Sequence, residues 1–215
     1  MTKSVIRNRE RRGAISGKQI VRRPKAAVTI VDTGICNLDS MARALSLCDA
    51  AITVTGDWTV VAKADRIVLP GVGAFPQAIA RLQAHNLLDS LREAALIRKI
   101  PILGVCLGMQ LIATVGNEIS RTSGLDLIAG EVKALTPSIK GERVPHVGWN
   151  EVVHDGSSAL LRNIRNGADF YFVHSYHLVP ERAEDVIALT SYCGGFVSIA
   201  GRENVFGVQD RKSVV

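Results

Sequence analysis

The sequence lacks the features that mark membrane-spanning, secreted and metal-binding proteins. No apolar run approaches the ~20 residues of a membrane helix, and no apolar signal segment follows the charged N-terminus. The cysteines show no paired spacing, so we predict neither zinc ligation nor a disulfide framework; they are Cys36, Cys48, Cys106 and Cys193. We therefore expect a cytoplasmic protein with reduced thiols, no metal or cofactor, and no membrane contact.

An excess of one sign of charge is also missing from most of the chain. The net charge is +6, but residues 1–25 hold nine of the 26 basic and one of the 20 acidic residues. The remaining residues carry 17 basic and 19 acidic side chains, so a nucleic-acid partner is not indicated. For residues 1–25 we expect a disordered basic arm. Binding of RNA, DNA or acidic lipid, or a transit peptide, is the alternative.

From Ala26 onward, short β-branched runs alternate with helical patterns. Strands are predicted over 26–31, 51–55, 66–70 and 101–105, and helices over 37–48, 76–98 and 107–115. This alternation predicts one α/β domain over residues 26–209, with a mostly parallel sheet flanked by helices. Closely spaced strand-like segments in the second half predict added antiparallel hairpins, at 125–135, 151–154, 169–177, 186–192, 196–200 and 205–209.

Cys106 is the candidate nucleophile. It lies in the segment GVCLGMQ (104–110), between a predicted strand and a predicted helix, with Gly104 and Gly108 two residues away on either side. This is the arrangement of a nucleophile elbow. A thiol with a pKa of roughly 8.5 needs a neighbouring base or cation to react at neutral pH, and a helix N-terminus favours the thiolate.

Two other loops lie at the carboxyl ends of predicted parallel strands, where such sheets bind ligands. They are DTGICN (32–37) and PGVGAF (70–75). The glycine-rich loop 70–73 offers backbone N–H groups with little side chain in the way. It is a candidate oxyanion hole, with the N–H of Leu107 as a second donor. An ordinary turn is the alternative.

Four segments together resemble one family. PGVGAF (70–75), GVCLGMQ (104–110), VPHVGWN (144–150) and YFVHSYH (171–177) are similar to motifs in the glutaminase subunits of imidazole glycerol phosphate synthase. Those subunits are class I (triad-type) glutamine amidotransferases of histidine biosynthesis. The resemblance covers about residues 27–209 and implies a flavodoxin-like class I glutamine amidotransferase domain.

The resemblance also implies an activity and a partner. Members of this family hydrolyse glutamine to glutamate and ammonia, and need no cofactor. The ammonia passes to a (β/α)8-barrel cyclase subunit in a heterodimer, which makes imidazole glycerol phosphate. Two alternatives remain open: a paralogue that feeds a surface-glycan aminating system, and a catalytically dead interaction subunit.

The resemblance further implies roles for individual residues. Cys106 matches the nucleophile that forms a glutamyl thioester. The oxyanion region is matched by Val72, Gly73 and Leu107. The groups that bind glutamine are matched by Gly71, Gln110, Glu118, His174, Ser175 and Tyr176. Loops that face the partner subunit are matched by Asn37, His146 and Trp149.

The loop after the first strand departs from the family pattern. The family usually has Asp-Tyr-Gly-x-Gly-Asn there, whereas this chain has Thr33 in place of tyrosine and Cys36 in place of glycine. This loop is implied to face the partner. The departures therefore bear on the coupling to the partner, and they favour the paralogue alternative, more than they bear on glutamine hydrolysis.

The segment after Gln209 departs from the family pattern completely. The family places its general base in a His-Pro-Glu motif there, but residues 210–215 read DRKSVV and all five histidines precede Gln209. A subunit that has lost activity is one interpretation. The other, which we favour, is a sequence cut short, because DRKSVV can be encoded by a nucleotide string that resembles a sequencing adapter. We therefore expect the 215-residue chain to be inactive, and the natural protein to continue with the motif.

Overall fold

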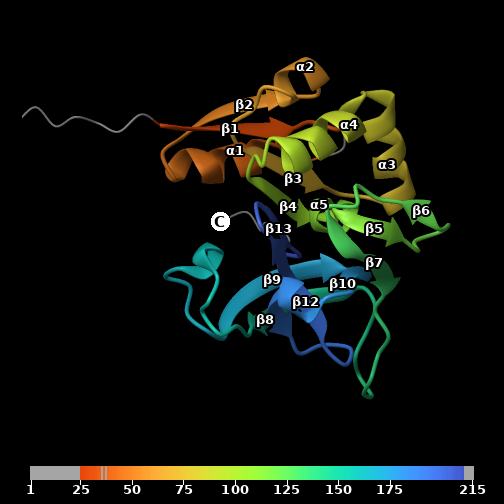
Figure 1. Cartoon of the computed structure of the whole chain (residues 1–215). Coiled ribbons are helices and arrows are strands. Elements are labelled where there is room, and N and C mark those ends of the chain that lie inside the picture. Colours follow the sequence, from red (N-terminus) through yellow and green to blue (C-terminus); the bar gives the residue numbers. More distant parts are fainter. Residues whose placement is uncertain (1–24, 35, 37, 211–215) are drawn as a thin grey trace, which may run out of the picture.

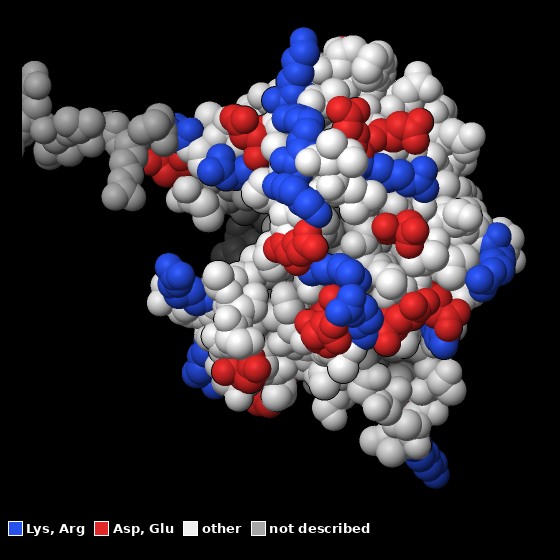
Figure 2. Space-filling view, viewed as in Figure 1, with Lys and Arg blue, Asp and Glu red and all other residues white. Residues whose placement is uncertain are grey.

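The structure of the chain, a computed structural model, describes residues 25–34, 36 and 38–210 (Figure 1). The expectations for the basic segment and for the tail concern residues 1–25 and 210–215, of which all except Lys25 and Asp210 lie outside the described residues. No helix among the described residues is long and apolar enough to cross a membrane. On the face shown in Figure 2, acidic and basic side chains are interspersed, in keeping with the nearly neutral charge of residues 26–215.

A seven-stranded sheet in the order β11-β12-β13-β4-β3-β1-β2 carries the site. Five strands run parallel: β1 (Ala26–Val31), β2 (Ala50–Thr55), β3 (Ile67–Gly71), β4 (Ile102–Cys106) and β13 (Val205–Val208). The antiparallel strands β11 (Val186–Thr190) and β12 (Phe196–Arg202) extend it. The first four strands lie within one residue of their predicted bounds, so this part of the α/β prediction is confirmed.

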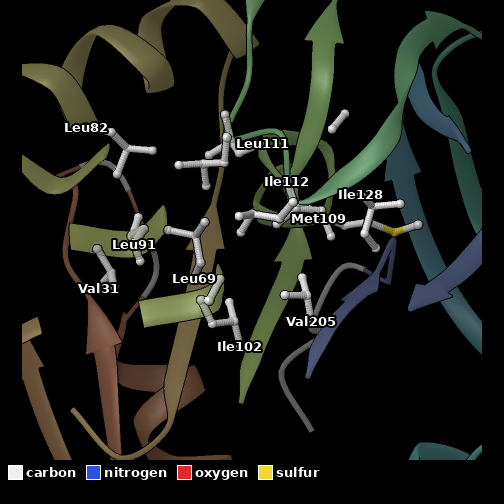
Figure 3. Close-up of a cluster of buried hydrophobic side chains, with 14 of the residues drawn as sticks. Val31, Leu69, Leu82, Leu91, Ile102, Met109, Leu111, Ile112, Ile128 and Val205 are labelled. Atoms are coloured by element: carbon white, nitrogen blue, oxygen red, sulfur yellow. The ribbon is translucent and has the colours of Figure 1, made fainter. Parts of the chain in front are cut away.

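Helices cover both faces of the sheet. Two successive residues of β1 show this, since successive side chains of a strand point to opposite faces. Ile30 of β1 belongs to a buried cluster with Met41 of α1 (Leu38–Leu47). Val31, the next residue, belongs to a larger cluster with Leu91 of α4 (Figure 3). The other helical elements are α2 (Trp58–Val61), α3 (Phe75–Ala84), α4 (Leu87–Arg92), α5 (Leu107–Leu111) and the short turns Glu93–Ile97, Ala159–Leu161 and Ala183–Asp185.

The prediction of one helix over 76–98 was wrong. The segment forms α3, α4 and a π-helical turn, with a break at Asn86, whose φ of 55° is left-handed. Asparagine tolerates this conformation better than most residues do. Leu82 and Leu87 on either side of the break are both fully buried. Apolar periodicity alone cannot detect the break, because both pieces bury an apolar face.

The prediction of a helix over 107–115 was also wrong at its end. Helix α5 ends at Leu111, and residues Ala113–Gly116 form strand β5. The carbonyl groups of Leu111, Ile112 and Ala113 accept hydrogen bonds from the N–H groups of residues 125–128. These long-range bonds use carbonyls that a longer helix would need, and the β-branched residues that follow favour a strand.

The second half adds two smaller sheets, in part as predicted. One has the order β10-β7-β5-β6, and in the other β8 pairs antiparallel with β9. The β7–β10 pair is antiparallel, but β5 pairs with β7 in parallel, and β13 joins β4 in parallel. The bounds are β6 (Thr122–Ser123), β7 (Ile128–Ala134), β8 (His146–Val152), β9 (Ala168–His174) and β10 (Tyr176–Pro180).

Candidate active site

Cys106 occupies a sharp turn between β4 and α5. Its backbone has φ 55° and ψ −116°, a strained conformation for a residue with a side chain. A Cβ atom on Gly108 would lie 1.7 Å from the carbonyl oxygen of Leu69, and one on Gly104 would lie 2.5 Å from that of Gly108. Because α5 approaches the main chain of β4 at Gly104 and that of β3 at Gly108, only glycine fits at both positions, and the thiol projects at the end of β4.

Cys106 lines a cavity of about 510 Å³ at the carboxyl ends of the parallel strands. The cavity brings together residues that are far apart in the sequence, from the loop after β3, from the elbow and from the junction of β9 with β10. Ten of the residues assigned to catalysis or glutamine binding line it: Gly71, Val72, Gly73, Cys106, Leu107, Gln110, Glu118, His174, Ser175 and Tyr176.

The glycine-rich loop lies directly beside the nucleophile. Gly71 is paired with Cys106 in the β3–β4 register, and a Cβ atom on Gly71 would lie 2.9 Å from Cβ of Leu107. Gly73 has a φ of 96°, which glycine adopts readily, and the side chain of Val72 is half-exposed. The loop therefore offers main-chain groups to a ligand bound at the sulfur.

Two buried amides connect the cavity wall to the sulfur. Gln110 Nε2 donates to the carbonyl oxygen of Tyr176 at 2.8 Å and to Oε1 of Gln209 at 3.1 Å. Nε2 of the fully buried Gln209 lies 4.0 Å from the Sγ atom of Cys106. Sequence reasoning missed Gln209 as a site residue. Its place directly after the last predicted strand, at the point where the resemblance to the family ends, was the available signal.

Glu118 holds the start of α3 rather than standing free in the cavity. Its Oε2 atom accepts a hydrogen bond from the backbone N–H of Phe75 at 2.7 Å. That N–H belongs to the first turn of the helix, where donors have no partner within the helix. The carboxylate therefore fixes the end of the glycine-rich loop, and it also lines the cavity.

His174 is a buried residue whose ring nitrogens both have partners. Nδ1 lies 2.9 Å from the carbonyl oxygen of Tyr176, and Nε2 lies 3.3 Å from Nδ1 of His146. Burial lowers the pKa of His174 to about 4, and the Tyr176 carbonyl opposes this shift. At neutral pH the imidazole is therefore uncharged.

The residues assigned to the partner interface occupy different environments. Trp149 is 62% exposed on β8 and contacts the ring of Tyr171, with 5.3 Å between centroids. His146 was expected to face a partner but is 2% exposed, and it stacks on Tyr192 with 3.9 Å between centroids. Burial lowers its pKa as well. Asn37 lies outside the described residues.

The other cysteines differ from Cys106 in setting. None of the four, all of which are in the described part of the chain, forms a disulfide. Cys36 also lines the cavity, with Sγ 3.5 Å from the carbonyl oxygen of Pro70. Sequence reasoning did not list Cys36 as a site residue, although the replacement of the family's glycine by cysteine could have drawn attention to this position. Burial raises the pKa of the Cys193 thiol, and Glu142 adds to the rise. Among residues 25–34, 36 and 38–210, no cluster of three or more potential metal ligands occurs.

Comparisons with known proteins agree with this geometry. The family model named glutamine amidotransferase class-I matches residues 29–209. The chain is 44% identical to the imidazole glycerol phosphate synthase subunit HisH of Moorella thermoacetica, over 85% of each chain. It is 41% identical to HisH of Caulobacter vibrioides, over 85% of this chain and 88% of the relative. The Trypanosoma brucei CTPS glutaminase domain with bound acivicin shares the fold, with a TM-score of 0.62 and 16% identity over 87% of both chains.

Proposed function

The chain belongs to the class I glutamine amidotransferase family, and we propose that it is the ammonia-producing subunit of an imidazole glycerol phosphate synthase. The HisH relatives place it among glutamine amidotransferases of histidine biosynthesis. One observation carries the proposal for the site. The strained residue at the elbow is a cysteine, and it opens into a cavity flanked by a glycine-rich loop.

The proposed reaction uses Cys106 as the nucleophile. Its thiolate attacks the side-chain carbonyl carbon of glutamine, which forms a C–S bond and a tetrahedral oxyanion. The N–H groups of the loop 71–73 and of Leu107 stabilise that charge. Collapse breaks the C–N bond, and the nitrogen takes up a proton and leaves as ammonia. Water then hydrolyses the glutamyl thioester, which releases glutamate and restores the thiol.

The proposed partner is a (β/α)8-barrel cyclase subunit that receives the ammonia in a heterodimer. The exposed Trp149 on β8 supports this part of the proposal, because a large exposed aromatic side chain is typical of protein interfaces. A paralogue that serves a surface-glycan aminating partner remains the alternative within the enzyme class. The altered loop with Thr33 and Cys36 favours it.

A second candidate function is a binding subunit without turnover. His174 is the one histidine among the described residues that line the cavity, and both of its ring nitrogens have other partners. After Gln209 the chain reads DRKSVV where the family has its His-Pro-Glu motif. We therefore propose that the 215-residue chain binds glutamine but hydrolyses it only at background rate, since general-base assistance is typically worth ~10²–10⁴ in rate.

Glutamate release from glutamine, measured for two proteins in the presence of the cyclase, tests these proposals. One is the 215-residue chain, and the other has residues 210–215 replaced by Phe-His-Pro-Glu and a family-like terminal segment. Only the second should release glutamate from glutamine above background. A glutamine-analogue electrophile should then modify it at Cys106 and not at Cys36, Cys48 or Cys193, as read by mass spectrometry.

The matched control is Cys106→Ser in the protein that carries the motif, which should neither turn over glutamine nor be labelled. Modification chiefly at another cysteine would sink the assignment of the nucleophile. Turnover by the unaltered 215-residue chain would instead show that an upstream histidine acts as the base. Genomic neighbours distinguish the partners, since histidine genes favour the cyclase and glycan genes favour the paralogue.

A further inference from the structure

One main-chain carbonyl joins the glutamine cavity to a pair of buried histidines. The oxygen of Tyr176 accepts from Nε2 of Gln110 at 2.8 Å and contacts Nδ1 of His174 at 2.9 Å. Gln110 is itself 5% exposed and bonded to Gln209. The orientation of the Gln110 amide therefore depends on the position of the Tyr176 carbonyl, and His174 is the other side chain in hydrogen-bond contact with that oxygen.

The chemistry of each partner fixes the direction of the hydrogen bonds. A carbonyl oxygen only accepts, so Nδ1 of His174 carries the proton. A neutral imidazole has one N–H, so Nε2 of His174 is an acceptor, and Nδ1 of His146, at 3.3 Å, donates to it. Nε2 of His146 is then an acceptor too. It faces Nδ2 of Asn150 at 3.0 Å, which is a donor.

The two rings are locked in place by aromatic neighbours. His146 stacks between Tyr192 and Phe172, with centroid distances of 3.9 and 5.3 Å. His174 meets Phe196 edge-to-face at 4.7 Å. A ring flip that inverted the order of donors and acceptors would have to break these aromatic contacts, so the packing favours the order given above.

The hydrogen bonds form one path across the molecule. It begins at Asn150, the neighbour of the exposed Trp149 on β8, and passes through both histidines to the carbonyl oxygen of Tyr176. From there Gln110 and Gln209 continue it to within 4.0 Å of the Cys106 sulfur. The path thus joins β8, the junction of β9 with β10, helix α5 and the residue after β13, which are far apart in the sequence except for β9 and β10.

We propose that His146 and His174 are positioning residues of the glutamine site, which hold the carbonyl of Tyr176 and through it the amide of Gln110 against the cavity that Cys106 lines. The ligand in this proposal rests on the proposed function, but the hydrogen-bond path does not. Both rings occupy the Nδ1–H tautomer, which is the minor form of a neutral histidine side chain in water.

The path depends on both rings staying neutral. Protonation of His174 at Nε2 would put two donors face to face, Nε2–H of His174 and Nδ1–H of His146. The titratable groups near the pair are His177 of β10 and Tyr192, and Lys133 of β7 acts on His177. Burial lowers the pKa of both rings, in line with neutral imidazoles at pH 7.

The test combines nitrogen NMR of the histidine rings with glutamine binding by the 215-residue chain. At pH 7, both His146 and His174 should show a protonated Nδ1 and a bare Nε2. His174→Phe keeps a packed ring but removes both hydrogen bonds. It should shift the side-chain amide signal of Gln110 and raise the glutamine dissociation constant about tenfold, which is the scale of one lost hydrogen bond.

Two further variants separate positioning from packing. His174→Asn keeps an N–H near the position of Nδ1 and should recover most of the glutamine affinity. His177→Phe changes a half-buried histidine of β10 that lies outside the path, so the Gln110 signal and the affinity should stay as in the unaltered chain. If His174→Phe does not fold, the tautomers of the unaltered chain and the behaviour of His174→Asn decide the question.

The outcomes for the two proposals are distinct. A protonated Nε2 on either ring at pH 7, or an unmoved Gln110 amide in His174→Phe, overturns the positioning role. Equal loss of affinity in His177→Phe overturns it as well, because it would point to packing alone. If the unaltered chain binds no glutamine while both tautomers are as described, the proposed function fails and the positioning path stands.

Discussion

The nucleophile elbow and the histidine layer form two walls of the same cavity, but different forces shape them. The elbow layer consists of residues 69–73 and 104–111. The histidine layer consists of β8, β9, Tyr192 and Phe196. In the elbow layer, main chain lies against main chain, as where a Cβ on Gly108 would come within 1.7 Å of the Leu69 oxygen. In the histidine layer, side chain lies against side chain, as between His146 and His174.

This difference decides what a sequence can reveal. Close approach of two backbones admits only glycine, so the elbow layer leaves a visible pattern of glycines around Cys106. A histidine, in contrast, suits a surface, a metal site or a packed core equally well. Its role in the histidine layer follows from the partner of each ring nitrogen, and those partners come from other strands.

The largest effect should come from adding one methyl group to the elbow layer. Gly108→Ala places a Cβ against the main chain of Leu69, which cannot move without distorting the β3–β4 pair. We expect a loss of about 3 kcal/mol or more in the free energy of unfolding, or failure to fold. Urea unfolding followed by circular dichroism measures this change.

Gly156→Ala is the matched control for the steric argument. A Cβ at Gly156 would meet nothing within 4 Å, so the cost comes only from its φ of +78°. That strain should cost about 1 kcal/mol. Similar losses for the two variants would mean that the elbow layer is not set by backbone contact, and the comparison of the two layers would fail.

Much of the fold follows from the sequence where local and long-range preferences agree. Strands β1 to β4 were predicted within one residue, because short apolar and β-branched runs between helical patterns have few other solutions. The helices failed where tertiary contacts overrode periodicity. Asn86 adopts a left-handed turn within an apolar pattern, and the carbonyls after Leu111 bond to residues 125–128.

The residues of the site likewise fall into those that local sequence predicts and those that depend on long-range pairing. The sequence placed Cys106 and its glycine-rich loop from local motifs, and the resemblance to a family supplied the residues on the opposite wall. Neither the motifs nor the resemblance predicted that His146 is buried. Residues that follow it on β8, such as Val147 and Trp149, are large and apolar but exposed, so the usual rule that apolar side chains are buried fails for this strand. Only the pairing of β8 with β9 brings His146 opposite His174.

Acid should weaken the histidine layer selectively. The pKa of His174 is lowered to about 4 by burial, from an ordinary value near 6.5. The unfolded chain therefore binds the proton more tightly than the folded chain does. The stability contributed by the neutral ring is complete above about pH 6.5 and is lost as the pH falls toward 4. The full difference amounts to about 3 kcal/mol.

The measurement is urea unfolding at several values of pH for the unaltered chain and for His174→Phe. The difference between the two should change with pH below 6.5, because the variant lacks the titrating ring. Taking a difference also removes Asp210, whose pKa is raised to about 6 by burial and which acts in the opposite direction. A pH-independent difference for His174→Phe would contradict a buried neutral ring.

The smallest effect on folding should come from the exposed rim of the histidine layer. Trp149 is 62% exposed and contacts Tyr171 at the surface. Trp149→Ala should therefore change the free energy of unfolding by less than about 1 kcal/mol. The affinity of the Trp149→Ala protein for the proposed cyclase should fall by about thirtyfold or more. This corresponds to the loss of about 2 kcal/mol of binding free energy, which is typical when an interface anchor is truncated.

Ile97→Ala is a suitable control, because Ile97 is 77% exposed at the end of the turn Glu93–Ile97, which follows α4 and is not part of the β8–β9 pair. It should leave the cyclase affinity unchanged. A loss of more than about 2 kcal/mol of folding stability in Trp149→Ala would place this side chain in the core rather than at a docking face. An unchanged affinity would remove the partner from this face. In either case the histidine path from Asn150 would still end at the Tyr176 carbonyl, but it would begin at a surface with no established partner, and its role would be confined to the glutamine site.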